Sequence, residues 1–65
     1  MPVVVVNMLS GRSDKKKAEL MRRVSEAVSG SLEVGLDHVR VILNEVPKSN
    51  WSVAGLPIEE YLKNK

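Results

Sequence analysis

Two apolar runs, Pro2–Leu9 and Val39–Val46, stand on either side of one long segment with helical periodicity. The first run is rich in β-branched residues and apolar almost throughout, which is typical of a strand covered on both faces. Between the runs, from about Asp14 to Glu33, apolar residues recur at three- and four-residue steps, which predicts an amphipathic helix. A strand, a helix and a second strand in this order predict a βαβ unit with parallel strands.

Turn and capping residues predict where the helix begins and ends. The segment Ser10–Arg12 has the composition of a turn, and Ser13 or Asp14 can then cap the helix through a side-chain oxygen. Gly35 follows the last periodic residues, and glycine is the common residue just past a helix C-terminus. We therefore expect the helix to stop near Gly35.

The segment after the second strand is short and rich in turn residues. Pro47 ends the strand, and residues 48–55 are expected to form a loop or a short hairpin that bends at Ala54–Gly55. Pro57 suits the first position of a short terminal helix. The expected fold is α/β, a βαβ unit with parallel strands and a C-terminal hairpin, in a single domain over residues 1–65.

The chain is too short to be stabilised easily by its own core. It has 65 residues and no cysteine, so disulfides and thiolate metal sites are excluded. Its one histidine, His38, cannot build a zinc site alone. Two strands also leave sheet edges that invite pairing with another chain. We therefore expect an oligomer, in the simplest case a dimer with a continuous four-stranded sheet, with larger rings covering the remaining edges.

Charge and hydropathy argue against two classes of partner. The net charge is only +2, and the chain has a single tryptophan and a single tyrosine, so it lacks the basic, aromatic surface of a nucleic-acid binder. The apolar start, Met1–Met8, lacks the basic residues and length of a signal peptide, and no segment approaches the ~20 apolar residues of a membrane span. We expect a cytoplasmic protein without nucleic-acid or membrane partners.

Proline directly follows the initiator methionine. If Met1 is removed, Pro2 becomes the first residue and carries a free secondary amine. Such an amine is both a base and a nucleophile, and free α-amino groups titrate at about 7.7–8.0, close to working pH. Many chains begin with Met-Pro for no chemical reason, so this start alone only makes Pro2 a candidate base.

Two arginines and one tryptophan are the other candidate site residues. Arg40 lies in a strand expected to be mostly buried; it either reaches solvent or pairs with a nearby carboxylate, or it binds a substrate carboxylate or enolate as a bidentate fork. Arg12 is either a solvated turn residue or part of a cleft at the strand C-termini. Trp51 is either an interface anchor or an apolar wall of a pocket.

Several segments, taken together, resemble the 4-oxalocrotonate tautomerase family. The segments that carry the resemblance are Pro2, Gly11–Asp14, Arg23–Ala27, Ser31–Leu32 and Val39–Ile42. They cover nearly the whole chain without gaps up to about Gly55. The resemblance implies a βαβ unit with a small hairpin, assembled as a homo-oligomer, a hexamer built as a trimer of dimers. It also implies that each site takes residues from more than one subunit.

The resemblance implies a role for each candidate residue. Pro2 would be the general base that moves a proton in a dienol acid, with no cofactor. Arg40 would bind a carboxylate and the neighbouring enol oxygen, while Arg12 would hold the far carboxylate of a dicarboxylate substrate. The main-chain amide of Leu9 would also bind the oxygen, and Trp51 would wall the pocket.

Three positions depart from the family pattern, and all of them concern pocket shape more than the base. Ser10 stands where an acidic residue often precedes Gly-Arg, Trp51 stands where phenylalanine is more usual, and the hairpin's glycine pair is reduced to Ala54–Gly55. Residues 49–53 contain no carboxylate to activate water. This favours tautomerisation over the hydrolytic dehalogenation of other superfamily members, with Glu45 left open as a water-activating group.

Three functions follow for comparison. The first is a cofactor-independent tautomerase acting on a 2-hydroxydienoate such as 2-hydroxymuconate. The second is a catalytically silent subunit or binding module of the same fold in a hetero-oligomer. The third, a small basic nucleic-acid binder, is weakest because the charge and the aromatic content are low.

Overall fold

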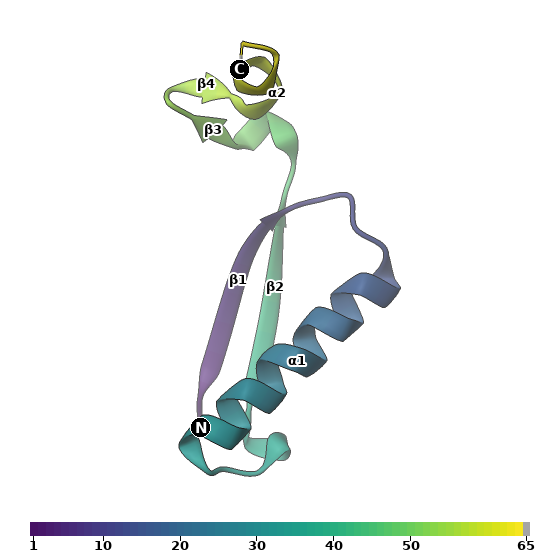
Figure 1. The fold of residues 1–65 in the computed structure, drawn as a ribbon, viewed down its shortest axis with the longest axis vertical. Helices are drawn as coiled ribbons and strands as arrows, with labels where there is room; N and C mark the ends of the chain where they lie inside the picture. The colour runs from purple at the N-terminus through teal and green to yellow at the C-terminus, as the bar shows by residue number, and fades with distance from the viewer. Residues whose placement is uncertain (65) are drawn as a thin grey trace.

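The computed structural model describes residues 1–64, and its body is a βαβ unit (Figure 1). Strand β1 spans Val3–Leu9, helix α1 spans Asp14–Leu32 and strand β2 spans Arg40–Val46. The two strands run parallel, with a register that runs from Val3 opposite Arg40 to Leu9 opposite Val46. The α/β class and the parallel pairing that the periodicity predicts are therefore confirmed.

The C-terminal segment forms a small hairpin followed by a helix. Its elements are a 3-10 turn η2 (Lys48–Asn50), strands β3 (Ser52–Val53) and β4 (Leu56–Pro57), and helix α2 (Ile58–Lys63). The strands β3 and β4 are antiparallel, and Ala54 and Gly55 connect them with φ values of 55° and 81°. Positive φ at both central residues is the geometry of a type I′ turn. The hairpin is confirmed, while α2 begins one residue later than predicted, with Pro57 as its N-cap.

The predicted span of α1, from about Asp14 to Glu33, is confirmed together with its Ser13 cap, and only the residue expected to stop the helix differs. The Ser13 hydroxyl accepts a hydrogen bond from the Lys16 backbone N–H at 3.2 Å, as expected of an N-cap. The helix ends before Gly35, because Glu33 takes the left-handed conformation (φ 57°) and its N–H donates to the Ser29 carbonyl. Gly35 instead opens a 3-10 turn, η1, over Leu36–His38.

Helix α1 covers one face of the strand pair, and the opposite face is bare. Among the described residues only Met8 and Val39 are buried, at 8% and 7% exposure. On the bare face Val3, Val5 and Ile42 are 58%, 54% and 53% exposed. The expectation of a strand covered on both faces is therefore not met within one chain, because one helix can cover only one side of a two-stranded sheet. We call this bare side the open face.

The C-terminal segment stands away from the βαβ body like an arm (Figure 1). The molecule is accordingly elongated, with extents of 45 × 23 × 17 Å. Neither α1 nor α2, within the described part of the chain, has the length and apolar character needed to cross a membrane. The placement of the arm matters for the site because it carries Trp51.

Candidate active site

The structure divides the five predicted site residues between the two ends of the strand pair. Pro2 and Arg40 lie where β1 and β2 begin, and Leu9 and Arg12 lie where β1 ends. Seven residues of strand separate these ends by about 20 Å, because each residue rises about 3.3 Å. A single chain therefore does not bring all five residues together.

Backbone contacts hold Arg40 beside Pro2. The Arg40 N–H donates to the Pro2 carbonyl oxygen at 3.0 Å. The Arg40 side chain is exposed, and its Nη1 donates to the carbonyl oxygens of Asp37 at 2.6 Å and Val39 at 3.4 Å. The expected burial of Arg40 is thus wrong, and its observed partners are backbone carbonyls rather than the carboxylates of Asp37 or Glu45. These two bonds use one nitrogen of the guanidinium, which has five N–H donors in all.

Gly35, which the sequence indicated as a helix stop, precedes the turn that holds Arg40. It is extended (φ −66°, ψ 151°) and is the N-cap of η1. The Asp37 carbonyl that receives Arg40 belongs to this turn.

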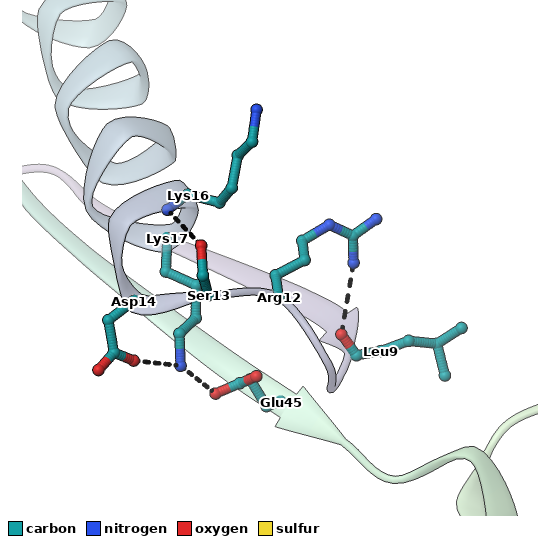
Figure 2. Close-up of polar contacts among 7 residues, drawn as sticks. All are labelled: Leu9, Arg12, Ser13, Asp14, Lys16, Lys17 and Glu45. Carbon is teal, nitrogen blue, oxygen red and sulfur yellow. Dashed lines mark hydrogen bonds and ion pairs between the residues drawn. The ribbon is translucent and has the colours of Figure 1, made fainter.

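At the other end, Arg12 borders an open hollow of about 460 Å³. The residues around it are Val6, Asn7, Met8, Leu9, Arg12, Leu20 and Trp51. Arg12 Nη1 lies 3.5 Å from the carbonyl oxygen of Leu9 and points back over the end of β1 (Figure 2). The hollow thus combines a mostly apolar lining with the Asn7 amide and one guanidinium, a mixture that is common in small-molecule sites.

The main-chain amide of Leu9 faces the same side as this hollow. The neighbouring Ser10 N–H donates across the sheet to the Val46 carbonyl oxygen at 3.0 Å. Successive backbone groups of a strand point to opposite edges, so the Leu9 N–H is directed to the unpaired edge of β1. No β2 residue borders the hollow, which therefore lies on that unpaired edge.

Trp51 enters the hollow from the arm. The backbone N–H of Trp51 donates to the Lys48 carbonyl oxygen at 3.2 Å, and the Trp51 carbonyl oxygen accepts from the Ile58 backbone N–H at 2.9 Å. These bonds tie Trp51 to η2 on one side and to the start of α2 on the other. The side chain is half-buried and lines the hollow, as a pocket wall would.

An ion-pair cluster occupies the first turn of α1 (Figure 2). Lys17 Nζ lies 2.8 Å from Oε1 of Glu45 and 3.3 Å from Oδ1 of Asp14. The hydrogen bond to Glu45 is the largest cause that raises the pKa of Lys17, and the bond to Asp14 is the next. Glu45 is thus engaged by a lysine on the helix side of the sheet, which argues against its activating a water molecule.

Sequence reasoning missed two polar pairs that join distant parts of the chain. One is Lys17 with Glu45, and the other is Asn7 with Asn44, whose amides lie 2.7 Å apart on the open face. No local pattern indicates such pairs, because 28 and 37 residues separate the partners in sequence. The strand register, once known, places Asn7 directly opposite Asn44.

Comparisons with known proteins agree with the fold and show the family. The family described as tautomerase enzyme matches residues 2–61. A 2-hydroxymuconate tautomerase of Pseudomonas putida is 46% identical over 57 residues, which cover 88% of this chain and 90% of that protein.

Two solved structures have the same fold. A heterohexamer 4-oxalocrotonate tautomerase from Chloroflexus aurantiacus has a TM-score of 0.88 at 42% identity, covering 92% of this chain and 97% of that one. A 4-oxalocrotonate tautomerase isozyme from Methylibium petroleiphilum has a TM-score of 0.90 at 31% identity, covering 98% and 100%. The family match over residues 2–61 includes all five candidate residues.

Proposed function

The chain belongs to the tautomerase family and is an isomerase, and we propose that it moves a proton in a 2-hydroxydienoate such as 2-hydroxymuconate, with Pro2 as the base. The reaction converts a dienol acid into a keto acid and needs no cofactor. The observation that carries this proposal is the pairing of Pro2 with Arg40, two residues far apart in sequence that one backbone hydrogen bond holds together.

The amine of Pro2 acts as both acceptor and donor of the proton. Once Met1 is removed, the neutral nitrogen takes the proton from the 2-hydroxyl group, and the resulting ammonium returns it to a carbon of the conjugated chain. Substrate and product are isomers, and the Pro2 amine ends as it began, so no other reactant is required. A cationic guanidinium nearby favours the neutral amine, and an α-amino group needs little help because it titrates at about 7.7–8.0.

The arginines supply binding and charge stabilisation. Negative charge develops on the enol oxygen as its proton leaves, and Arg40 lies beside the base with most of its N–H donors outside the two backbone contacts. Arg12 binds the far carboxylate of the substrate. The Leu9 N–H adds a donor to the enol oxygen, and Trp51 shields the conjugated chain from water.

The complete site is shared between copies of the chain. Pro2 and Arg40 of one copy lie about 20 Å from Leu9 and Arg12 at the far end of the same strand, so a substrate a few bonds long cannot reach both pairs. Another copy must supply its hollow to the first copy's base. We propose a homo-hexamer for this assembly, because the bare open face and the projecting arm leave each chain with several surfaces to cover.

Blocking the amine tests this function directly. A synthetic chain that begins at Pro2 is compared with the same chain acetylated on the Pro2 nitrogen, which turns the basic amine into a non-basic amide and alters no other residue. The free chain should consume 2-hydroxymuconate, followed by its ultraviolet absorbance, and acetylation should lower kcat by at least about a hundredfold. Equal activity of the two chains would refute Pro2 as the base.

A silent subunit is the second candidate, and one comparison favours it. A relative of this fold is described as a heterohexamer, so a second kind of chain is a known partner within the family. In that case the purified chain with a free Pro2 amine would assemble incompletely or show no turnover until a second chain is added.

A further inference from the structure

An amide pair interrupts the apolar surface of the open face. Nδ2 of Asn44 donates to Oδ1 of Asn7 at 2.7 Å, and both side chains are exposed. The register places Val5 opposite Ile42 on one side of this pair, and Leu9 opposite Val46 on the other. The two amides are therefore polar groups within an otherwise apolar strip that the helix does not cover.

A second copy of this chain is the partner that the structure favours for the open face. One chain buries only Met8 and Val39 among its described residues, which is far too little for a stable domain. The proposed site is also incomplete within one chain, as its two halves lie at opposite ends of β1. Both arguments name the same occupant, a second copy, and neither requires a partner of another kind.

When a partner covers the open face, the unused hydrogen-bonding groups of the Asn7–Asn44 pair determine which partner fits. The single bond uses one N–H of Asn44 and one lone pair of Asn7. The second N–H and the oxygen of Asn44 stay available, as do both N–H groups of Asn7. A surface that holds both donors and acceptors can be matched by a copy of itself, whereas an apolar partner leaves these amides buried without bonds, which is costly.

We propose that the Asn7–Asn44 pair is a self-recognition element, which admits identical chains to the assembly and rejects related chains with apolar residues at these two positions. A single buried polar residue has this effect in coiled coils, where it specifies the partner and lowers stability. The pair therefore favours a homo-oligomer over a hetero-oligomer. This inference concerns partner choice and does not depend on which residue transfers the proton.

A mixing experiment tests the inference. Wild-type chain, labelled with heavy isotopes, is unfolded and refolded with an equal amount of the Asn7→Val/Asn44→Val variant, and native mass spectrometry counts the mixed assemblies. We expect mixed species at least tenfold below the statistical fraction. Labelled and unlabelled wild type should mix statistically, and so should wild type and Asn64→Val, which changes an exposed asparagine of the arm. Statistical mixing with the double variant would overturn the inference and leave the role of Pro2 untouched.

The thermal stability of the variants provides a second measurement. Each single variant, Asn7→Val or Asn44→Val, leaves one amide opposite an apolar side chain, so its Tm should fall below that of the wild type. The double variant removes both amides, and its Tm should exceed those of both single variants. If the valine pair makes the chain insoluble, Asn7→Ala/Asn44→Ala, which also lacks hydrogen-bonding side chains, replaces it in the mixing, where exclusion from wild-type assemblies is again expected and free mixing contradicts the inference.

Discussion

The backbone N–H of Arg40 donates to the carbonyl oxygen of Pro2 at 3.0 Å, so the proposed base and its neighbouring cation are joined through the main chain. Their relation is set by strand pairing, in which Val3 lies opposite Arg40. Side-chain substitutions at Arg40 should therefore leave the position of Pro2 intact. This makes the pair suitable for separating charge from geometry.

Replacing Arg40 tests whether a planar fork is needed at this position. Arg40→Ala should lower kcat by about 10²–10³-fold, the usual effect of removing one group that stabilises an oxyanion. Arg40→Lys keeps the charge but cannot bind two oxygens in one plane, so its kcat should recover only in part. Steady-state kinetics with 2-hydroxymuconate measure both. Full activity of the lysine variant would show that charge alone is sufficient.

Replacing Arg12 should affect binding more than turnover. Arg12→Ala should raise KM for a dicarboxylate about tenfold or more with a small change in kcat, because the far carboxylate lies away from the reacting atoms. A 2-hydroxydienoate that lacks the far carboxylate is the matched control. Its KM should be nearly the same for the wild type and the variant, and an equal rise with both substrates would contradict the assignment.

The elements of the fold were predictable because their signals are local. The apolar runs and the helical period predict β1, α1 and β2, and the Ala54–Gly55 turn lies where its composition indicates. The span of α1 was also predictable, but the residue that stops it was not. Glu33, not Gly35, adopts the left-handed conformation, and Gly35 is extended at the start of η1.

The candidate site was predictable in its residue types but not in its arrangement. Arg40 looked like a buried strand residue, yet it lies exposed at the first position of β2, where the two backbone carbonyls receive it. The separation of Arg40 from Arg12 follows from the register of two parallel strands, which no local pattern specifies. Burial could not be judged from the strand pattern, because one face of the strand pair stays bare within a single chain.

The Ala54–Gly55 turn offers a stability test. Ala54 has a φ of 55°, which costs a residue with a Cβ about 1 kcal/mol, and Gly55 at 81° bears no such cost. Ala54→Gly should therefore keep or raise the free energy of unfolding, whereas Gly55→Ala should lower it by about 1 kcal/mol. Urea unfolding of both variants measures the difference, and the reverse order would contradict the type I′ geometry.

The Lys17 cluster predicts a stability loss at high pH. The pKa of Lys17 is raised above its ordinary value of 10.5, chiefly by the hydrogen bond to Glu45. Because the pKa is raised in the folded state, charged Lys17 stabilises the fold. This stabilisation is complete below pH 10.5 and is lost as pH rises through the folded-state pKa of Lys17. Urea unfolding across this pH range should show that the free energy of unfolding falls less for Lys17→Arg than for the wild type, because the arginine guanidinium stays charged. Equal losses would mean that Lys17 contributes nothing to the alkaline transition.

Complementation between two impaired variants tests the shared site most directly. Pro2→Ala and Arg12→Ala chains are refolded alone and together, and turnover of 2-hydroxymuconate is measured after native mass spectrometry has verified mixed assemblies. If Pro2 and Arg12 of one site come from different copies, about one site in four regains both residues in an equal, random mixture. The account predicts recovered turnover at a low substrate concentration, at which the Arg12→Ala chain alone is slow. Mixed assemblies no more active than the two separate proteins would contradict it.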